Sequence, residues 1–295
     1  MSAMRATARA HGAITVVNAI ATGKGAALGV RLSTTATVEF RPSPSPSVEI
    51  ELPEPGEDPA LATQCIRRVL ERVGRMDDGL AAHVRTASDI PMSRGLKSSS
   101  AAANAICMAA FAALGERPSD EELLHTAVDA ALDAGVTITG AYDDACASYY
   151  GGFVATDNTA RKLVFREELT GDYAVILVVP PRKIRKAEAA KAPVGPLKPV
   201  LEEAWSKAAR GRWSEAMLLN SLAYGAAYDL GNRFVLEALE QGASAGGISG
   251  TGPAVALVAM AEDGDRLRDL ARQRAPPGAD VMMTELNDEK AAVVR

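Results

Sequence analysis

The chain has 295 residues, of which 47% are hydrophobic and 23% charged, and its formal net charge is -5. A chain of this length and apolar content can bury a core without disulfides or a structural metal, which excludes an intrinsically disordered protein. The mild negative charge argues against a nucleic-acid-binding protein, which usually carries a basic field, and leaves open a small anionic ligand held by local loops.

The cysteines and the N-terminus indicate a compartment. Cys65, Cys107 and Cys146 form no CxxC pair, which fits a reducing cytosol better than a disulfide framework. No apolar segment of signal-peptide type follows the first residues, and no apolar run reaches the roughly 18 residues of a membrane span. We therefore expect a cytoplasmic, soluble protein without a membrane partner; its oligomeric state is not predictable.

The first elements read as strands. Residues 13–18 are β-rich, and residues 32–40 and 48–52 alternate between apolar and polar side chains. The Pro/Ser run at 42–47 lies between the last two, which predicts a hairpin with this run at its tip. Residues 59–73 then show apolar residues four apart and predict a helix.

The middle of the chain is predicted to be mainly helical. After a strand at 81–86, a Ser-rich loop at 91–100 runs into an Ala-rich helix that ends near Gly115. Ser119 and Glu122 form a capping box for the next helix. A Gly/Asp-rich turn at 140–144 then leads into the helical stretch 145–150.

A second group of elements follows. Residues 175–179 are almost wholly apolar and predict a strand at the centre of a sheet, whereas residues 180–199 lack periodicity and predict a mobile loop. The further predictions are helices at 200–210, 214–229 and 264–274 and strands at 254–259 and 281–286. The mixture of hairpins and helices predicts an α+β fold of two domains, residues 1–168 and 169–295.

The loop at 91–100 is the most informative segment. A glycine and three consecutive serines run into a strong helix former, so free backbone N–H groups and the helix dipole face the loop and favour an anion. Lys97 and Arg94 add positive charge. A Ser-rich helix cap without a ligand is the alternative, and a Walker A loop is excluded because Leu96, not glycine, precedes Lys97.

Two further loops could carry chemistry. The turn at 140–144 contains Asp143 and Asp144, which can provide a general base, a metal ligand or only a helix cap. The run at 246–253 holds four glycines in seven residues, which predicts either tight turns or backbone that approaches a ligand closely.

Together and in this order, these loops resemble the motifs of the GHMP kinases, the superfamily of galactokinase, homoserine kinase and mevalonate kinase. Its Pro-x-x-x-Gly-Leu-Gly-Ser-Ser-Ala motif corresponds to residues 91–101, and its late motif to residues 247–253. The early motif corresponds to residues 12–29, although its form departs from the usual one. Lys97 with three serines, the run 17–27 and the run 139–145 look most like the archaeal-type shikimate kinases.

The resemblance implies a fold and an activity. The first domain resembles a ribosomal protein S5 domain 2-like unit, and the second a ferredoxin-like sandwich, with the ligands in the cleft between them. The family phosphorylates the 3-hydroxyl of shikimate with Mg²⁺ and ATP, a step toward chorismate and the aromatic amino acids. The ATP triphosphate would be held by Pro91, Met92, Ser93, Arg94, Gly95, Leu96, Lys97, Ser98, Ser99, Ser100 and Ala101.

The resemblance also implies the other site residues. Ser99 matches the superfamily's Mg²⁺ ligand, and the offset in mevalonate kinase points to Asp133 as its partner. The catalytic aspartate is Asp144 by one spacing and Asp143 by another, and Asp144 is preferred. The residues expected to contact shikimate are Asn18, Lys24, Gly250 and Thr251.

The remaining expectations concern the cation that binds the shikimate carboxylate and the conformation of the loop at Lys97. Lys24, Arg94 and the basic cluster at 182–186 are unranked candidates for the shikimate carboxylate, although the cluster also fits a solvated loop. We expect Lys97 to contact phosphate, and its loop to differ locally from the superfamily form because lysine does not cheaply adopt a positive φ. The alternatives are another GHMP kinase, such as homoserine kinase, or a non-catalytic metabolite sensor of the same fold.

Overall fold

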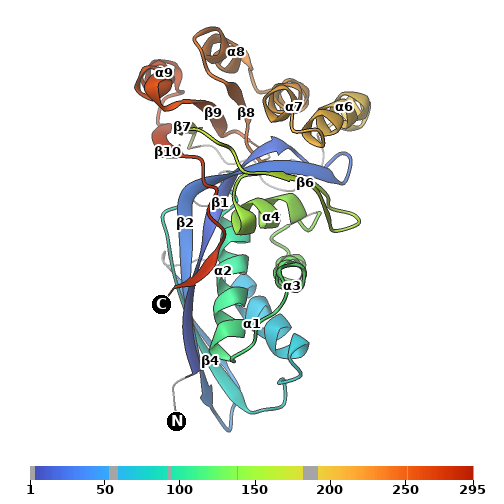
Figure 1. Cartoon of the computed structure of the whole chain (residues 1–295), viewed down its shortest axis with the longest axis vertical. Coiled ribbons are helices and arrows are strands. Elements are labelled where there is room, and N and C mark those ends of the chain that lie inside the picture. The colour runs from blue at the N-terminus through green and yellow to red at the C-terminus, as the bar shows by residue number, and fades with distance from the viewer. Residues whose placement is uncertain are drawn as a thin grey trace.

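Two β-sheets, each with its own helices, make up the molecule (Figure 1). The computed structural model describes residues 4–52, 59–91, 95–137, 139–181, 192–250 and 252–294. The fold is α+β, as predicted from the order of elements. Within the described residues, no helix combines the length and the apolar character that a membrane span requires.

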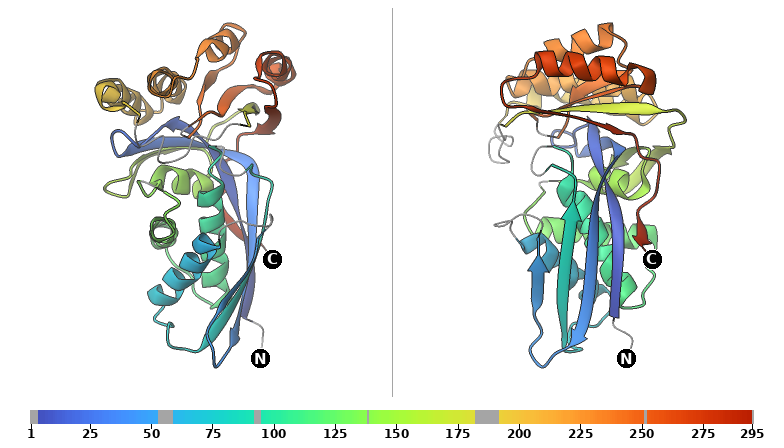
Figure 2. Two further views of the ribbon diagram at one scale, coloured as in Figure 1. Left: turned by 180° about the vertical axis from the view of Figure 1, so that it is seen from behind. Right: turned by 90° about the vertical axis from the view of Figure 1, so that its left-hand side faces the viewer.

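The first sheet has seven strands and a long, strongly curved shape (Figure 2). Its main order is β11-β1-β2-β4-β3, and β5 and β6 extend it from β2. The strands are β1 (Met4–Val17), β2 (Lys24–Pro42), β3 (Val48–Glu51), β4 (Leu80–Ser88), β5 (Phe153–Asp157), β6 (Lys162–Glu167) and β11 (Ala292–Val294).

The predicted hairpin between residues 32–40 and 48–52 is wrong. The strand β3 lies parallel to β4, and β4 pairs antiparallel with β2. The helix α1 (Ala60–Arg72) joins β3 to β4, which is the crossover connection that two parallel neighbours need. The nine-residue β4 takes the place next to β2, while the four-residue β3 is left at the edge.

Four helices cover one face of this sheet. They are α1, α2 (Ser98–Ala113), α3 (Asp120–Asp133) and α4 (Tyr142–Tyr150). Helix α2 is the central one, since 11 of its 16 residues are buried and most of them are alanine. The capping box is confirmed, because the Ser119 side chain accepts a hydrogen bond from the Glu122 amide.

The second sheet has four antiparallel strands in the order β10-β7-β9-β8. The strands are β7 (Tyr173–Val179), β8 (Ala245–Ile248), β9 (Val255–Met260) and β10 (Asp280–Glu285), and the helices are α6 (Lys198–Ala208), α7 (Trp213–Ala227), α8 (Arg233–Glu240) and α9 (Ala261–Arg274), with a short 3-10 turn, η1 (Gly195–Leu197). Six of the seven residues of β7 are buried, which confirms the predicted central strand. Local sequence patterns predicted neither β8 nor α8.

The two halves share a hydrophobic core. It brings Ile14 and Leu28 of the first sheet against Val175 and Leu177 of β7, and it includes Leu96 of the Ser-rich loop. The last strand, β11, also returns to the first sheet and pairs with β1 (Figure 2). The loop that precedes α2 therefore lies where the two halves of the molecule meet.

Candidate active site

The N-terminus of α2 presents an anion-binding end. Helix α2 begins at Ser98, and no side chain caps it and no acidic residue occupies its first turn. The amides of Ser100 and Ala101 donate to the Lys97 carbonyl oxygen at 3.1 Å. The first amides of a helix have no intrahelical acceptor, so those of Ser98 and Ser99 are available to a phosphate. Residues 92–94, which include Arg94, lie outside the described part of the chain.

The glycine-rich loop of the second half contacts both the start of this loop and strand β1. The Ser249 hydroxyl donates to the Gly95 carbonyl oxygen at 2.7 Å, and the Gly250 amide donates to Thr15 Oγ1 at 2.8 Å. A Cβ atom at Gly250 would lie 2.8 Å from the Gly95 Cα atom, so the backbones of the two loops are in contact. Thr251, expected to contact the substrate, lies outside the described residues.

Asp143 and Asp144 are both buried in the first turn of α4, but they face different partners. Asn158 Nδ2 donates to Asp143 Oδ1 at 2.7 Å, and Thr156 Oγ1 donates to Asn158 Oδ1 at 2.7 Å. A Cβ atom at Gly25 would lie 2.5 Å from the Asp143 Cγ atom, so only glycine fits there. The Asp143 carboxylate is thus enclosed by the protein itself.

Asp144 points toward the N-terminus of α2. Lys97 Nζ lies 2.9 Å from Asp144 Oδ1, and the two side chains are only 12% and 11% exposed. At this distance the ion pair is also within hydrogen-bonding range, and because a carboxylate has about four lone-pair sites, Asp144 can accept further hydrogen bonds beside it. Burial, followed by the neighbouring charge of Asp143, raises the pKa of Asp144 to about 7, although Lys97 opposes the shift.

Lys97 adopts the backbone conformation that the sequence argued against. Its φ of 62° and ψ of 31° are left-handed, so the expectation that lysine avoids a positive φ here is wrong. This conformation costs a non-glycine residue roughly 1–2 kcal/mol. The buried ion pair with Asp144 holds the lysine side chain in place.

Asn18 bridges elements of the protein. Its Nδ2 donates to the Gly250 carbonyl oxygen at 2.8 Å, and its Oδ1 accepts from the Ile20 amide at 2.9 Å. Its own amide donates to Asn220 Oδ1 at 2.9 Å. Both polar groups of the side chain are therefore engaged, which holds Asn18 in place, and one N–H and one lone pair remain available.

Lys24 rests on an aromatic ring of the second half. Its Nζ lies 4.4 Å from the centre of the Trp205 ring, within the range of a cation–π contact. Trp205 Nε1 donates to the Thr156 carbonyl oxygen at 3.1 Å, which fixes the ring against β5. The other candidate cations for a carboxylate, at 182–186, lie outside the described residues.

Asp133 forms an ion pair with Arg68 of α1. Its Oδ2 lies 2.6 Å from Arg68 Nε, and the Arg68 hydrogen bond lowers the pKa of this carboxyl. The described residues contain no group of three or more His, Cys, Asp or Glu side chains that could hold a metal ion.

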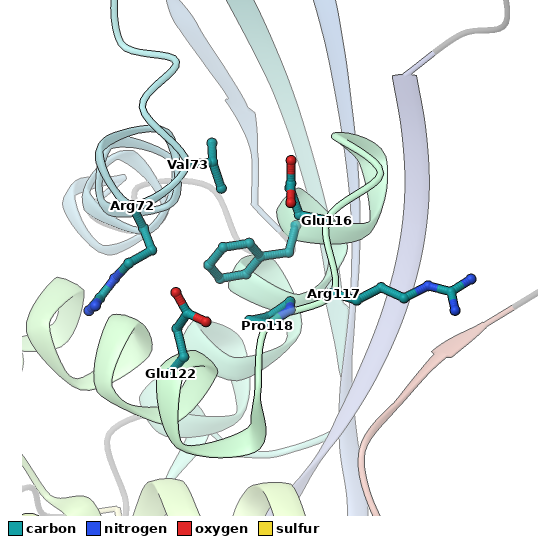
Figure 3. A pocket seen from close by; sticks show the side chains of 7 residues that line it. Arg72, Val73, Glu116, Arg117, Pro118 and Glu122 are labelled. Atoms are coloured by element: carbon teal, nitrogen blue, oxygen red, sulfur yellow. The ribbon is translucent and has the colours of Figure 1, made fainter.

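The structure thus brings together Lys97, Ser98, Ser99 and Asp144, and places Gly95 against Gly250. Motif reasoning missed Asn158 and Trp205, because neither belongs to a local pattern. The pocket in Figure 3 lies elsewhere, at the ends of α1 and α2. It has a volume of about 170 Å³ and is lined by Arg72, Val73, Phe111, Glu116, Arg117, Pro118 and Glu122.

Known proteins similar to this chain cover its whole length. The family model of the GHMP kinases N-terminal domain matches residues 60–152. A shikimate kinase of Methanothermobacter thermautotrophicus is 38% identical over 299 residues, with 100% of both chains covered. A shikimate kinase of Halobacterium salinarum is 41% identical, with 88% of this chain and 89% of the relative covered.

Solved structures share the fold. A homoserine kinase from Cytophaga hutchinsonii has a TM-score of 0.80 at 17% identity and covers 100% of this chain and 98% of its own. The mevalonate kinase of Methanococcus jannaschii has a TM-score of 0.72 at 14% identity and covers 95% and 98%. At such identities the likeness concerns the fold alone.

Proposed function

Because the chain belongs to the GHMP kinases, and within them to the family of its full-length shikimate kinase relatives, we propose that it transfers the γ-phosphoryl group of ATP to the 3-hydroxyl of shikimate. The family and the fold predicted from the sequence are confirmed by these relatives. The observation that carries the proposal is the meeting of a buried carboxylate, Asp144, with the anion-binding end of α2 through Lys97.

We assign the ATP triphosphate to the loop at 91–101. Phosphoryl transfer depends on positioning and on neutralising charge, and the unpaired amides of Ser98 and Ser99 provide both. The contact of Gly95 with Gly250 and Ser249 fixes the start of this loop from the second half. The nucleotide would then lie where the two sheets meet, with shikimate beside Asp144.

Asp144 is our candidate for the general base, because it faces the proposed phosphate-binding end and its carboxylate has lone pairs beyond the one that Lys97 engages. It would orient the 3-hydroxyl and accept its proton as the oxygen attacks phosphorus. A pKa near 7 suits a base that works near neutral pH. Asp143, enclosed by Asn158 and Gly25, would instead hold the first turn of α4 in position.

The residues present fit a Mg²⁺ ion that arrives with ATP. Mg²⁺ usually takes one or two protein oxygens and fills its remaining positions with substrate phosphates and water. Ser99, in the first turn of α2, would provide one oxygen, and Asp133 would provide a second after release from Arg68. The ion would neutralise charge on the phosphates.

We also propose the ligands of the enzyme and its cellular compartment. Shikimate and ATP are its proposed ligands. Lys24 is our candidate cation for the shikimate carboxylate, because it precedes Gly25, which lies against Asp143. Cys65, Cys107 and Cys146 are free and buried, which suits a reducing compartment such as the cytoplasm.

The test is a panel of alcohols. The purified chain is incubated with Mg²⁺, ATP and, separately, shikimate, homoserine, mevalonate or galactose, and ADP release is followed. We expect turnover with shikimate, and loss of at least 100-fold in Asp144→Asn with nucleotide binding retained. Turnover with homoserine alone would identify a homoserine kinase, and no turnover with any alcohol would favour a non-catalytic metabolite sensor.

A further inference from the structure

Lys97 connects the two ends of the proposed reaction. Its backbone caps the N-terminus of α2, where phosphate is expected, and its Nζ lies 2.9 Å from Asp144 Oδ1. Within the described part of the chain, Asp144 is its one carboxylate partner within 4 Å. Lys97 therefore lies between the proposed phosphate-binding end and the proposed base.

The backbone conformation of Lys97 makes this position unusual. Lys97 is left-handed, with φ 62°, at a point where glycine would be free of strain. Non-glycine residues persist in such conformations where the surrounding structure fixes them, often at functional sites. Here the neighbouring residues Gly95 and Leu96 are tied to Ser249 and to β1, and the lysine side chain is 12% exposed.

The ammonium group has donors to spare. A lysine carries three N–H donors, and the contact with Asp144 needs only one of them. The amides of Ser98 and Ser99 open toward the same end of α2. A phosphoryl oxygen bound by these amides would lie beside the lysine.

We propose that Lys97 is a catalytic residue with two simultaneous contacts, one that keeps Asp144 as a carboxylate and one that binds an oxygen of the transferred phosphoryl group. The proposal rests on the proposed kinase activity and adds to it the cation that links base and nucleotide. It extends the expected phosphate contact of Lys97 to the base.

The step balances without proton transfer to or from Lys97. The 3-hydroxyl oxygen forms a bond to the γ-phosphorus, and the bond from that phosphorus to the oxygen bridging it to the β-phosphate breaks. ADP leaves with the electron pair of that bond, and the hydroxyl proton passes to Asp144. Lys97 remains an ammonium throughout and offsets the charge on the phosphoryl oxygens.

The decisive variant is Lys97→Gly, because glycine keeps the left-handed backbone and removes only the side chain. We expect kcat with ATP and shikimate to fall about 100-fold or more, a size typical for loss of one transition-state donor. The acid limb of the pH profile should also move to higher pH, since Lys97 opposes the raised pKa of Asp144. Lys97→Arg keeps the charge and should recover part of the activity.

A matched control is Arg161→Gly. Arg161 also has a left-handed backbone, with φ 50°, and forms an ion pair with Asp129 at 2.7 Å outside the proposed site. This variant should keep the wild-type kcat and pH profile. Both variants are checked for folding by thermal denaturation and for binding of a non-hydrolysable ATP analogue.

The outcomes separate this inference from the proposed function. If the wild type phosphorylates shikimate and Lys97→Gly keeps the same kcat and pH profile, Lys97 is only a loop residue and the inference is overturned. A lower kcat with an unmoved acid limb would overturn its contact with the base. Absence of shikimate phosphorylation in the wild type would instead refute the proposed function.

Discussion

The contact between Gly95 and the Ser249–Gly250 loop is open to a quantitative test by Gly95→Ala. Gly95 has a φ of +85°, which costs alanine roughly 1–2 kcal/mol. The added Cβ atom would overlap the Ser249 carbonyl oxygen and lie 3.0 Å from its carbonyl carbon. Moving the loops apart would break the hydrogen bond from the buried Ser249 hydroxyl to Gly95, which costs about 1–3 kcal/mol more.

The matched control is Gly115→Ala. Gly115 has nearly the same φ, +80°, but a Cβ atom there would meet nothing within 4 Å. Both variants therefore lose the conformational part of the free energy of unfolding, and only Gly95→Ala loses the contact. The difference of about 1–3 kcal/mol corresponds to roughly 5- to 150-fold in KM for ATP if it falls on the nucleotide-bound loop.

The assay combines urea denaturation of both variants with steady-state kinetics at varied ATP. We expect Gly115→Ala to keep the wild-type KM for ATP and Gly95→Ala to raise it at least about fivefold. Equal free energies of unfolding and equal KM values for the two variants would show that the second half of the molecule does not shape the ATP loop.

Three further predictions concern the carboxylates. Because burial raises the pKa of Asp144 to about 7 from the usual 3.8, kcat/KM for shikimate should fall as the pH drops through 7. The same raised pKa means that the folded state should lose stability as the pH rises from about 4 to 7, and Asp144→Asn should abolish this pH dependence of the urea midpoint. Asn158→Ala strips Asp143 of its amide partner, so we expect a loss of about 1–3 kcal/mol in the free energy of unfolding and a lower kcat, and an unchanged kcat would remove Asp143 from the positioning role. Asp133→Asn should raise the Mg²⁺ concentration for half-maximal activity about tenfold, whereas Arg68→Ala, which removes only the ion pair, should not; identical Mg²⁺ curves would exclude Asp133 as a ligand.

Local patterns predicted the elements whose signals lie within a few residues. The capping box at Ser119, the helix after the serine run and the buried strand β7 all depend on neighbours in the sequence. Strand pairing does not depend on sequence neighbours in this way. The strand β3 pairs with β4 because α1 carries the chain across the sheet, and no feature of residues 42–52 reveals that route.

The candidate site shows the same division. The sequence identified both aspartates but could not choose between them, because two spacings fit. Helix geometry separates them, since consecutive residues on a helix point about 100° apart. Asp143 therefore meets Asn158 and Gly25, while Asp144 meets Lys97. Asn158 reaches Asp143 only through the pairing of β5 with β2, which no local motif encodes.

The glycines around the candidate site take on a more specific meaning in the structure. Those at 246–253 predicted either tight turns or backbone that approaches a ligand closely. Gly25 instead makes room for the Asp143 carboxylate, and Gly95 and Gly250 make room for each other across the two halves. Each of these glycines thus lets two parts of the protein pack closely beside the proposed base or the proposed ATP loop. It follows that the geometry of the proposed site depends on the fit between the halves, because the loop proposed to bind phosphate and the loop that contacts it belong to different sheets.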